Sequence, residues 1–310
     1  MSGRPIIIDT DPGQDDALAI LLAVASPEVE VLAITTVAGN VPQPLVTRNA
    51  LALLTLTGRT DIPVYRGCER PLLRKLYTAE YVHGPTGVDG ADLPEPTVDA
   101  GHGHGVDRII ELCMDSGDRP VTLCPLGPLT NIGMAIAKEP RIAERIAEIV
   151  WMGGAFVEAG NTTPLAEFNA YVDPHAAHIV FSSGVPLTIF PLDVTHRALM
   201  TAHSIEALAA YDTPVALAAA GMVRFYERHD IDKYDIPGAP MHDPCVIAYL
   251  IDPSLFTGTR QPVAVDHEHE ASIGNTTFAP DADGGHDVLV MRDVDADRFF
   301  ELLVSRIGSL

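Results

Sequence analysis

The chain has 310 residues, of which 47% are hydrophobic, and this is enough for the core of one large α/β domain spanning residues 1–310. Its formal net charge of −22 excludes binding to nucleic acid or to an anionic membrane surface, because both require basic patches. We expect a cytoplasmic protein, since the sequence shows no secretory signal, no apolar run long enough to cross a membrane and four widely spaced cysteines.

Residues 6–17 carry a crowded set of acidic side chains where a predicted strand gives way to a helix. Three β-branched residues at 6–8 predict a buried strand, Pro12 and Gly13 break it, and an apolar helical pattern follows. The acidic residues of this junction are Asp9, Asp11, Asp15 and Asp16.

Carboxylates this close together repel one another, so either some are protonated or a cation lies among them. A hard divalent cation is the economical solution, because Ca²⁺ and Mg²⁺ take six or more oxygen ligands. The alternative is that Asp15 or Asp16 caps the helix and the other aspartates are solvated. Capping accounts for one or two acidic residues but not for four around a Pro-Gly turn.

Strands alternate with helices along the rest of the chain, which predicts a mostly parallel central sheet flanked by helices. The predicted strands lie at residues 6–8, 29–37, 62–65, 121–126, 148–152, 186–192, 263–266 and 288–292. The predicted helices include residues 47–56, 108–114, 173–182, 215–228, 242–250 and 296–307. A long irregular stretch at 67–105 is expected to be functional or mobile.

Polar or turn residues follow several of these strands directly. They are Asp11, Asn40, residues 126–127, residues 152–153 and Asp193. Because the carboxyl ends of parallel strands meet at one edge of a sheet, we expect these residues to converge on one crevice, which becomes the active site.

Six sequence blocks give a more specific indication. They are DTDPGQDDA at 9–17, AITTVAGN at 33–40, PLGPLTN at 125–131, WMGG at 151–154, AEFN at 166–169 with Asp173-Pro174, and HDP at 242–244. Their types and order resemble the inosine–uridine-preferring nucleoside hydrolases over essentially the whole chain. The resemblance implies hydrolysis of the N-glycosidic bond of ribonucleosides to base and ribose, with tightly bound Ca²⁺, by a homodimer or homotetramer.

Carried over residue by residue, the resemblance also implies roles for individual side chains. Carboxylates of Asp11, Asp16 and Asp243 would bind Ca²⁺ together with the backbone carbonyl of Leu126. The residues expected to bind the ribose, or in the case of His83 to flank the base, are Asp15, Asn40, Met152, Asn161, Glu167, Asn169 and His83. His242 would lie beside the base, with Tyr226, His229 and Tyr234 as further candidates there.

The chemistry needs such a set of groups. Cleavage at the anomeric carbon passes through an oxocarbenium-like state, as in glycoside hydrolysis. A cation-bound water next to a carboxylate can attack, and Asp11 is the expected base. The departing base must take a proton, for which we expect His242 to be the donor.

Two other functions stay open from the sequence alone. The pair Asp9 and Asp11 superficially resembles the motif of haloacid dehalogenase-like aspartyl phosphatases, but Gly13 stands where that motif has Thr or Val. A non-catalytic Ca²⁺- or nucleoside-binding protein would need the same ligands without His242. The preferred base is also left open.

Overall fold

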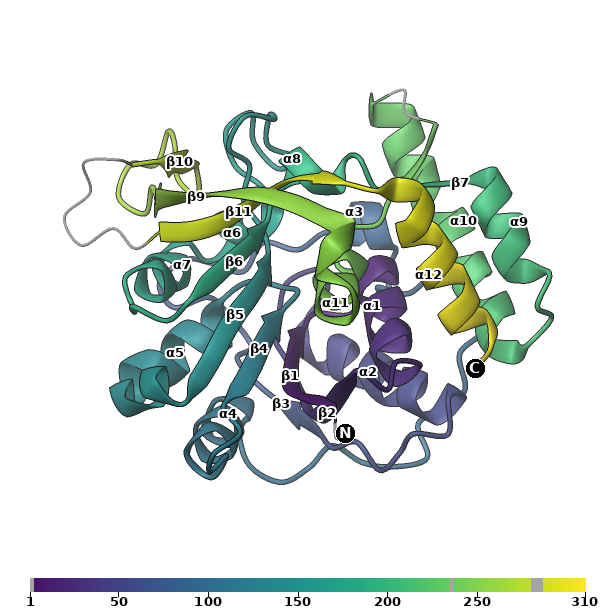
Figure 1. Ribbon diagram of the computed structural model, residues 1–310, viewed down its shortest axis with the longest axis horizontal. Helices are drawn as coiled ribbons and strands as arrows, with labels where there is room; N and C mark the ends of the chain where they lie inside the picture. Colours follow the sequence, from purple (N-terminus) through teal and green to yellow (C-terminus); the bar gives the residue numbers. More distant parts are fainter. Residues whose placement is uncertain (1–2, 235–236, 280–286) are drawn as a thin grey trace.

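A mixed sheet forms the centre of the computed structural model, which describes residues 3–234, 237–279 and 287–310, with the side chains of 229–234 and 287 left aside (Figure 1). Nine strands of this sheet lie within the described ranges. From one edge to the other they are β10 (Thr276–Phe278), β9 (Phe256–Val265), β11 (Asp287–Val294), β6 (Leu187–Phe190), β5 (Ile146–Met152), β4 (Val121–Pro125), β1 (Arg4–Thr10), β2 (Val29–Thr36) and β3 (Val64–Arg66).

The strands from β11 to β3 run parallel, whereas β9 is antiparallel to β11 and β10 is antiparallel to β9. The parallel strands therefore present their carboxyl ends along one edge, as the alternation of strands and helices predicts. A separate pair of antiparallel strands, β7 (Leu199–Thr201) and β8 (Gly238–Pro240), lies outside the main sheet.

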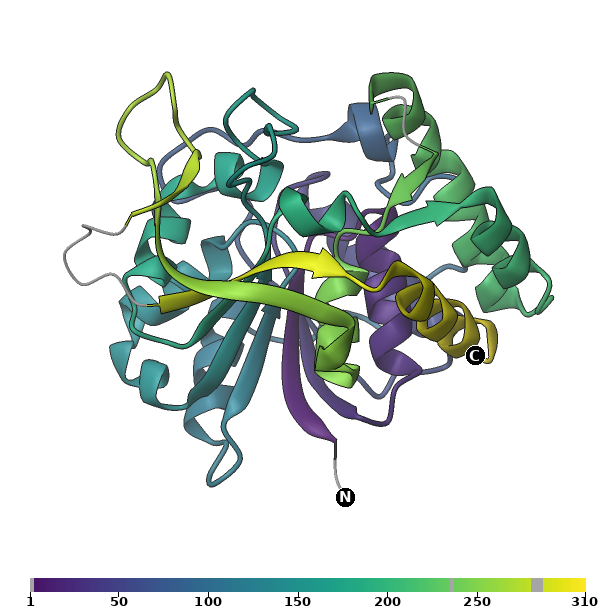
Figure 2. The same ribbon diagram turned by 45° about the horizontal axis from the view of Figure 1, so that its top comes forward.

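Helices cover both faces of the sheet, as Figures 1 and 2 show. One face carries α4 (Gly105–Met114), α5 (Thr130–Lys138) and α7 (Pro174–Phe181). The other face carries α1 (Gln14–Val24), α2 (Gln43–Leu56), α9 (Ala202–Ala209), α10 (Pro214–Tyr234), α11 (Pro244–Ile251) and α12 (Ala296–Gly308). Short helices α3 (Glu80–His83), α6 (Phe168–Val172), α8 (Leu192–Thr195), η1 (Pro140–Glu144) and η2 (Pro253–Leu255) complete the order.

Strand β1 illustrates how the two faces are filled. Its residues alternate between faces, so Ile6 and Ile8 pack into the core under α1 while Ile7 packs into the core under α5. All three side chains are fully buried, and burial of each contributes roughly 1.5–3 kcal/mol. A strand buried on both faces is expected to be continuously apolar, as residues 6–8 are. The polar residues of β1 begin at Asp9, near its carboxyl end.

The predicted strands and long helices agree with the structure to within about four residues at each end, with two exceptions. Helix α10 continues to Tyr234, beyond the predicted end at 228, and 263–266 is only the end of the long strand β9. The sequence analysis did not find α3, α6, α8, α9, β7, β8 or β10. Apart from α9, which has eight residues, these elements have three to five residues, so a hydrophobic period is hard to recognise in them. Three cysteines, Cys113, Cys124 and Cys245, are buried free thiols, and Cys68 is partly exposed.

Candidate functional site

The turn between β1 and α1 holds Asp16 firmly in place. The Thr10 hydroxyl and the Gly13 N–H donate hydrogen bonds to its carboxylate, the latter over 2.9 Å, and Asn40 Nδ2 donates a third over 3.1 Å. Burial nevertheless raises the pKa of Asp16 above its usual range. Neutral hydrogen-bond donors therefore hold this carboxylate in position, and no Lys or Arg of the described residues forms an ion pair with it.

Asp11 lies in a narrow slot at the end of β1. The Asn40 N–H donates to its Oδ2 over 2.7 Å, while its Oδ1 is buried and has no hydrogen-bond partner among the described residues. A Cβ atom at Gly39 or Gly127 would come within 2.0 Å or 2.1 Å of this carboxylate. Burial, and then the charge of Asp16, raise the pKa of Asp11 well above its usual range. A buried carboxylate oxygen without a donor fits a cation as its partner.

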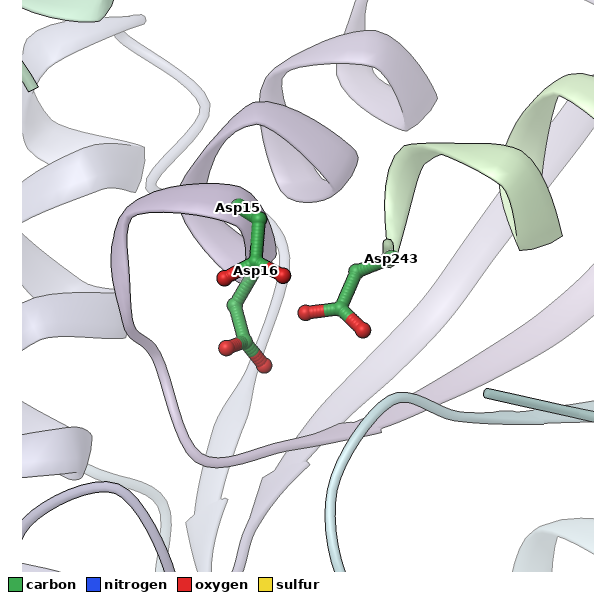
Figure 3. Close-up of side chains that lie close together, drawn as sticks. All are labelled: Asp15, Asp16 and Asp243. Atoms are coloured by element: carbon green, nitrogen blue, oxygen red, sulfur yellow. The ribbon is translucent and has the colours of Figure 1, made fainter. Parts of the chain in front are cut away.

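A close group of three carboxylates lies beside Asp11. Asp243 immediately precedes α11 and points toward Asp15 and Asp16 at the start of α1 (Figure 3). Carboxylate oxygens of these three residues lie within 4.8 Å of one another. Burial raises the pKa of Asp243 well above its usual range, and the charges of Asp15, Asp16 and Asp11 raise it further. We call Asp11, Asp15, Asp16 and Asp243 the acidic end of the cavity.

This oxygen-only donor set fits a hard divalent cation and disfavours zinc. The predicted ligands Asp16 and Asp243 both belong to the close group. That group contains Asp15, which the sequence analysis expected to bind ribose, and does not contain Asp11 among the described residues. Asp11 still contributes an unpartnered oxygen next to it.

Asp9, the remaining aspartate of the junction, is held within the sheet. Its Oδ1 accepts hydrogen bonds from the Thr35 hydroxyl and, over 2.7 Å, from Asn131 Nδ2. Burial raises its pKa to about 7. Asp9 does not line the cavity described below, and the hydrogen bonds to its Oδ1 join β1 to β2 and α5.

Asn169 connects two strand ends at the floor of the cavity. Its Nδ2 donates to the carbonyl of Leu126 over 2.7 Å and to the carbonyl of Met152 over 3.1 Å. A carbonyl oxygen has two lone pairs, so Leu126 can accept this bond and still coordinate a cation. Both backbone carbonyls thus lie at the carboxyl ends of β4 and β5, where the sequence analysis expected them.

Glu167 and Asn161 line the cavity but also hold their own loop together. Glu167 caps α6, accepting from the N–H groups of Asn169 and Ala170 over 2.8 and 3.0 Å, and it accepts from Gly154 N–H over 2.8 Å. Burial raises its pKa to about 7 despite these bonds. Asn161 Oδ1 accepts from the Phe168 N–H over 2.9 Å. These bonds fix both side chains before any sugar arrives.

Rings form a second group in the cavity, which we call the aromatic end and define as His83, His196, Tyr226 and His242. The His83 and Tyr226 rings are stacked, with centroids 5.6 Å apart and an interplanar angle of 17°. His242 lies 5.7 Å from the His196 ring, and its Nδ1 is 2.7 Å from Thr195 Oγ1. Burial, followed by the charges of His196 and His83, lowers the pKa of His242 well below its usual range.

The acidic and aromatic ends open into one cavity. The residues that line it are Asp15, Asn40, Ala79, Tyr81, Val82, His83, Leu126, Met152, Asn161, Thr162, Glu167, Phe168, Asn169, His196, Tyr226, His242 and Asp243. Every predicted site residue lines this cavity except Asp11 and Asp16, which lie at its acidic end. The side chains of His229 and Tyr234 lie outside the described part of the chain.

The sequence analysis missed several lining residues. Tyr81 and Val82 precede His83 on α3, and Phe168 lies between two predicted residues, so position in the chain could have indicated them. His196 follows α8, and no motif marks it. His102 and His104 are exposed and do not line the cavity.

Comparisons with known proteins agree with this geometry. The model of the family described as inosine-uridine preferring nucleoside hydrolase matches residues 6–301. The chain is 45% identical to the pyrimidine-specific ribonucleoside hydrolase RihA of Photobacterium profundum, over 99% of both chains. A plant nucleoside hydrolase, PpNRh1, superposes with a TM-score of 0.93 at 34% identity, over 99% of both chains. A purine-preferring ribonucleoside hydrolase from Gardnerella vaginalis superposes with a TM-score of 0.92 at 33% identity, over 98% of both chains.

In the part of the chain that the structure describes, no helix is long and apolar enough to cross a membrane.

Proposed function

The chain belongs to the inosine–uridine preferring nucleoside hydrolase family, and from this premise we propose that it is a Ca²⁺-dependent hydrolase of pyrimidine ribonucleosides. The reaction itself is hydrolysis of the N-glycosidic bond of a ribonucleoside, which releases a free base and ribose. The observation that carries the assignment is that a group of buried carboxylates and a pair of stacked rings meet at one cavity.

The acidic end accounts for the proposed cofactor. Asp15, Asp16 and Asp243 would hold Ca²⁺ together with Asp11 and the Leu126 carbonyl. When bound, Ca²⁺ would lower the pKa of a water molecule and offset the repulsion among the carboxylates. The unpartnered Oδ1 of Asp11 is the best placed group to take the proton from the attacking water.

The ribose would lie between the two ends. Asn40, Asn161, Glu167 and Asn169 line this middle part, and their backbone bonds hold them rigidly. Rigid donors and acceptors can favour a distorted sugar, because they need not reorganise as the oxocarbenium character develops. Asp15 also lines the cavity, so it is placed to meet both ligands, a cation and a ribose hydroxyl.

The aromatic end would receive the base. A flat base fits beside the stacked rings of His83 and Tyr226, which gain from offset contact with another π-system. His242 lies within the same end, and its lowered pKa keeps the free imidazole neutral near pH 7. A neutral imidazole can still donate an N–H hydrogen bond to a base nitrogen as negative charge accumulates on it.

The proposed pyrimidine preference rests on relatedness. Identity to the pyrimidine-specific RihA is 45%, compared with 33% to the purine-preferring enzyme, at similar coverage. The test is kcat/KM for uridine, cytidine, inosine and guanosine, with nitrophenyl riboside as a substrate that carries no nucleobase. We expect uridine and cytidine to exceed both purine nucleosides at least about tenfold, which is about 1.4 kcal/mol in transition-state binding. Equal values, or faster cleavage of inosine, would remove the preference but not the hydrolase activity.

The cytoplasmic location and the homodimer or homotetramer expected from the sequence remain predictions. Gel filtration with light scattering would determine the assembly.

A further inference from the structure

Gln14 is a buried side chain that contacts the segment carrying His83. It is the first residue of α1, directly before Asp15, and it is fully buried. Its Nε2 donates to the backbone carbonyls of His83 and Asp89 over 2.9 and 3.1 Å. Its Oε1 lies 2.7 Å from His83 Nδ1. One amide thus contacts the histidine backbone, the histidine ring and the end of the same loop.

These contacts determine the orientation of the amide. Both carbonyl oxygens can only accept, so the group that faces them must be the NH₂ of Gln14. The atom that faces His83 Nδ1 is therefore the amide oxygen, which can only accept as well. The proton in this contact must then belong to His83 Nδ1. In the neutral ring, Nε2 carries the lone pair and acts as an acceptor toward whichever group meets it.

Other contacts show that the whole segment is built against the turn before α1. Asn49 Nδ2 donates to the carbonyl of Pro12 over 3.1 Å and to that of Thr86 over 2.8 Å, which joins the same two segments a second time. A Cβ atom at Gly13 would lie 2.5 Å from His83 Nδ1, so the ring packs directly on the turn. The His83 ring is buried on this side and stacked on Tyr226.

The helix α10, which carries Tyr226, is positioned against the same segment. Gly90 and Gly221 lie in close contact. A Cβ atom at Gly90 would lie 2.5 Å from the Gly221 carbonyl oxygen, and one at Gly221 would lie 2.4 Å from the Gly90 carbonyl oxygen. Helices α3 and α10 lie side by side at the top of the molecule (Figure 2). The turn before α1, the His83 segment and α10 therefore form one packed unit.

We propose that Gln14 is a positioning residue for base recognition: it fixes His83 in the Nδ1–H tautomer and sets the plane of its ring at the aromatic end. This inference rests on the proposed function only in that His83 faces the base. The assignment also gives the strand–helix junction a second role, because the residue next to the proposed metal ligand Asp15 orients the ring that meets the base.

The direct test is ¹⁵N-histidine NMR of the full chain, with His83→Gln used to assign the His83 signals. The ¹⁵N shifts, assigned through two-bond couplings between the ring nitrogens and the carbon-bound ring protons, distinguish the two tautomers. We expect the wild type to carry its proton on Nδ1. Gln14→Leu, which is similar in size but has no polar atom, should mix the tautomers. Gln14→Glu keeps an acceptor for Nδ1–H and should restore the wild-type tautomer.

The kinetic test separates this role from that of the metal. Gln14→Leu should lower kcat/KM for uridine about three- to tenfold, the effect of one lost hydrogen bond, mostly through KM. Nitrophenyl riboside, which carries no base for His83 to recognise, should be cleaved within about twofold of wild type. The matched control is Gln43→Leu, because Gln43 is also buried but its Nε2 donates to the hydroxyls of Thr36 on β2 and Thr47 on α2. This control variant should leave the His83 tautomer unchanged, and also the ratio of the kcat/KM values for uridine and nitrophenyl riboside.

Two results would overturn the inference. One is a wild-type His83 with its proton on Nε2, which the Gln14 contact forbids. The other is a folded Gln14→Leu protein, with wild-type circular dichroism, in which the His83 tautomer is unaltered and the ratio of kcat/KM for uridine to that for nitrophenyl riboside is also unaltered. If His83→Gln itself leaves uridine cleavage intact while the Gln14 tautomer effect is present, the proposed role of His83 in the site fails and the positioning by Gln14 stands.

Discussion

At the acidic end of the cavity the side chains come from the end of β1 and the starts of α1 and α11. At the aromatic end they come from α3, α10, the end of α8 and, for His242, the position directly before Asp243. Asp11 directly follows β1 and lies between two glycines. His83 and Tyr226 instead depend on packing between a four-residue helix and a long one. The first arrangement permits almost no substitution, and the second can change its rings without disturbing the sheet. We therefore expect chemistry to be lost at one end and selectivity to be tuned at the other.

The largest effect should come from the acidic end. Asp11→Ala removes the proposed base and a ligand of the cation, and residues that act as a unit fail together. We expect kcat to fall by about 10⁵-fold or more on uridine and on nitrophenyl riboside alike. Asp61→Ala, a surface carboxylate paired with Arg59, is the control and should have no effect. If the variant lost only uridine cleavage and still cleaved nitrophenyl riboside, Asp11 would act on the departing nucleobase and not on the attacking water.

Removal of a ribose hydroxyl should have the next largest effect. A site built to bond a hydroxyl rejects an analogue without it by about 10⁴-fold, because its buried polar groups are left unpaired. We expect kcat/KM for 2′-deoxyuridine to fall by about this factor relative to uridine. Similar rates would show that Asp15, Asn40 and Asn169 do not bind the sugar.

His242 tests whether the aromatic end takes part in chemistry. If it donates the proton to the departing base, His242→Ala should slow uridine cleavage by about 10²–10⁴-fold. Nitrophenolate is a stable anion, so nitrophenyl riboside should be cleaved at a near wild-type rate. Equal losses on both substrates would give His242 a structural role through its contact with Thr195. If neither substrate is cleaved more slowly, the proton donor must be another group, such as His196 or Tyr226.

The smallest effect should follow from the stacked pair. Tyr226→Leu keeps an apolar side chain in the buried position but removes the ring that stacks on His83, a contact of about 0.5–1.5 kcal/mol. We expect kcat/KM for uridine to fall about three- to tenfold, with Ca²⁺ affinity by calorimetry unchanged. A change in Ca²⁺ affinity would contradict the separation of the two ends.

The same contrast explains what could be predicted from the sequence. Strand ends in a parallel sheet converge by topology, so Asp11, Asn40 and Leu126 could be placed together from their positions alone. Asp243 needed the resemblance of its HDP block, because nothing local distinguishes a metal ligand from a helix cap. The links from Gln14 to His83 and from His242 to Thr195 join residues far apart in the chain, and no local pattern encodes them.

The contacts of α1 also bear on when during its synthesis the chain can become active. Helix α1 packs against α11 and α12, and β11 completes the sheet beside β6. Until α11, β11 and α12 have emerged from the ribosome, α1 lacks these partners and β6 presents an unpaired edge that can pair with another chain. Long-range pairing of this kind slows folding. The acidic end therefore cannot assemble on a chain that lacks these later elements, and activity must wait for their synthesis.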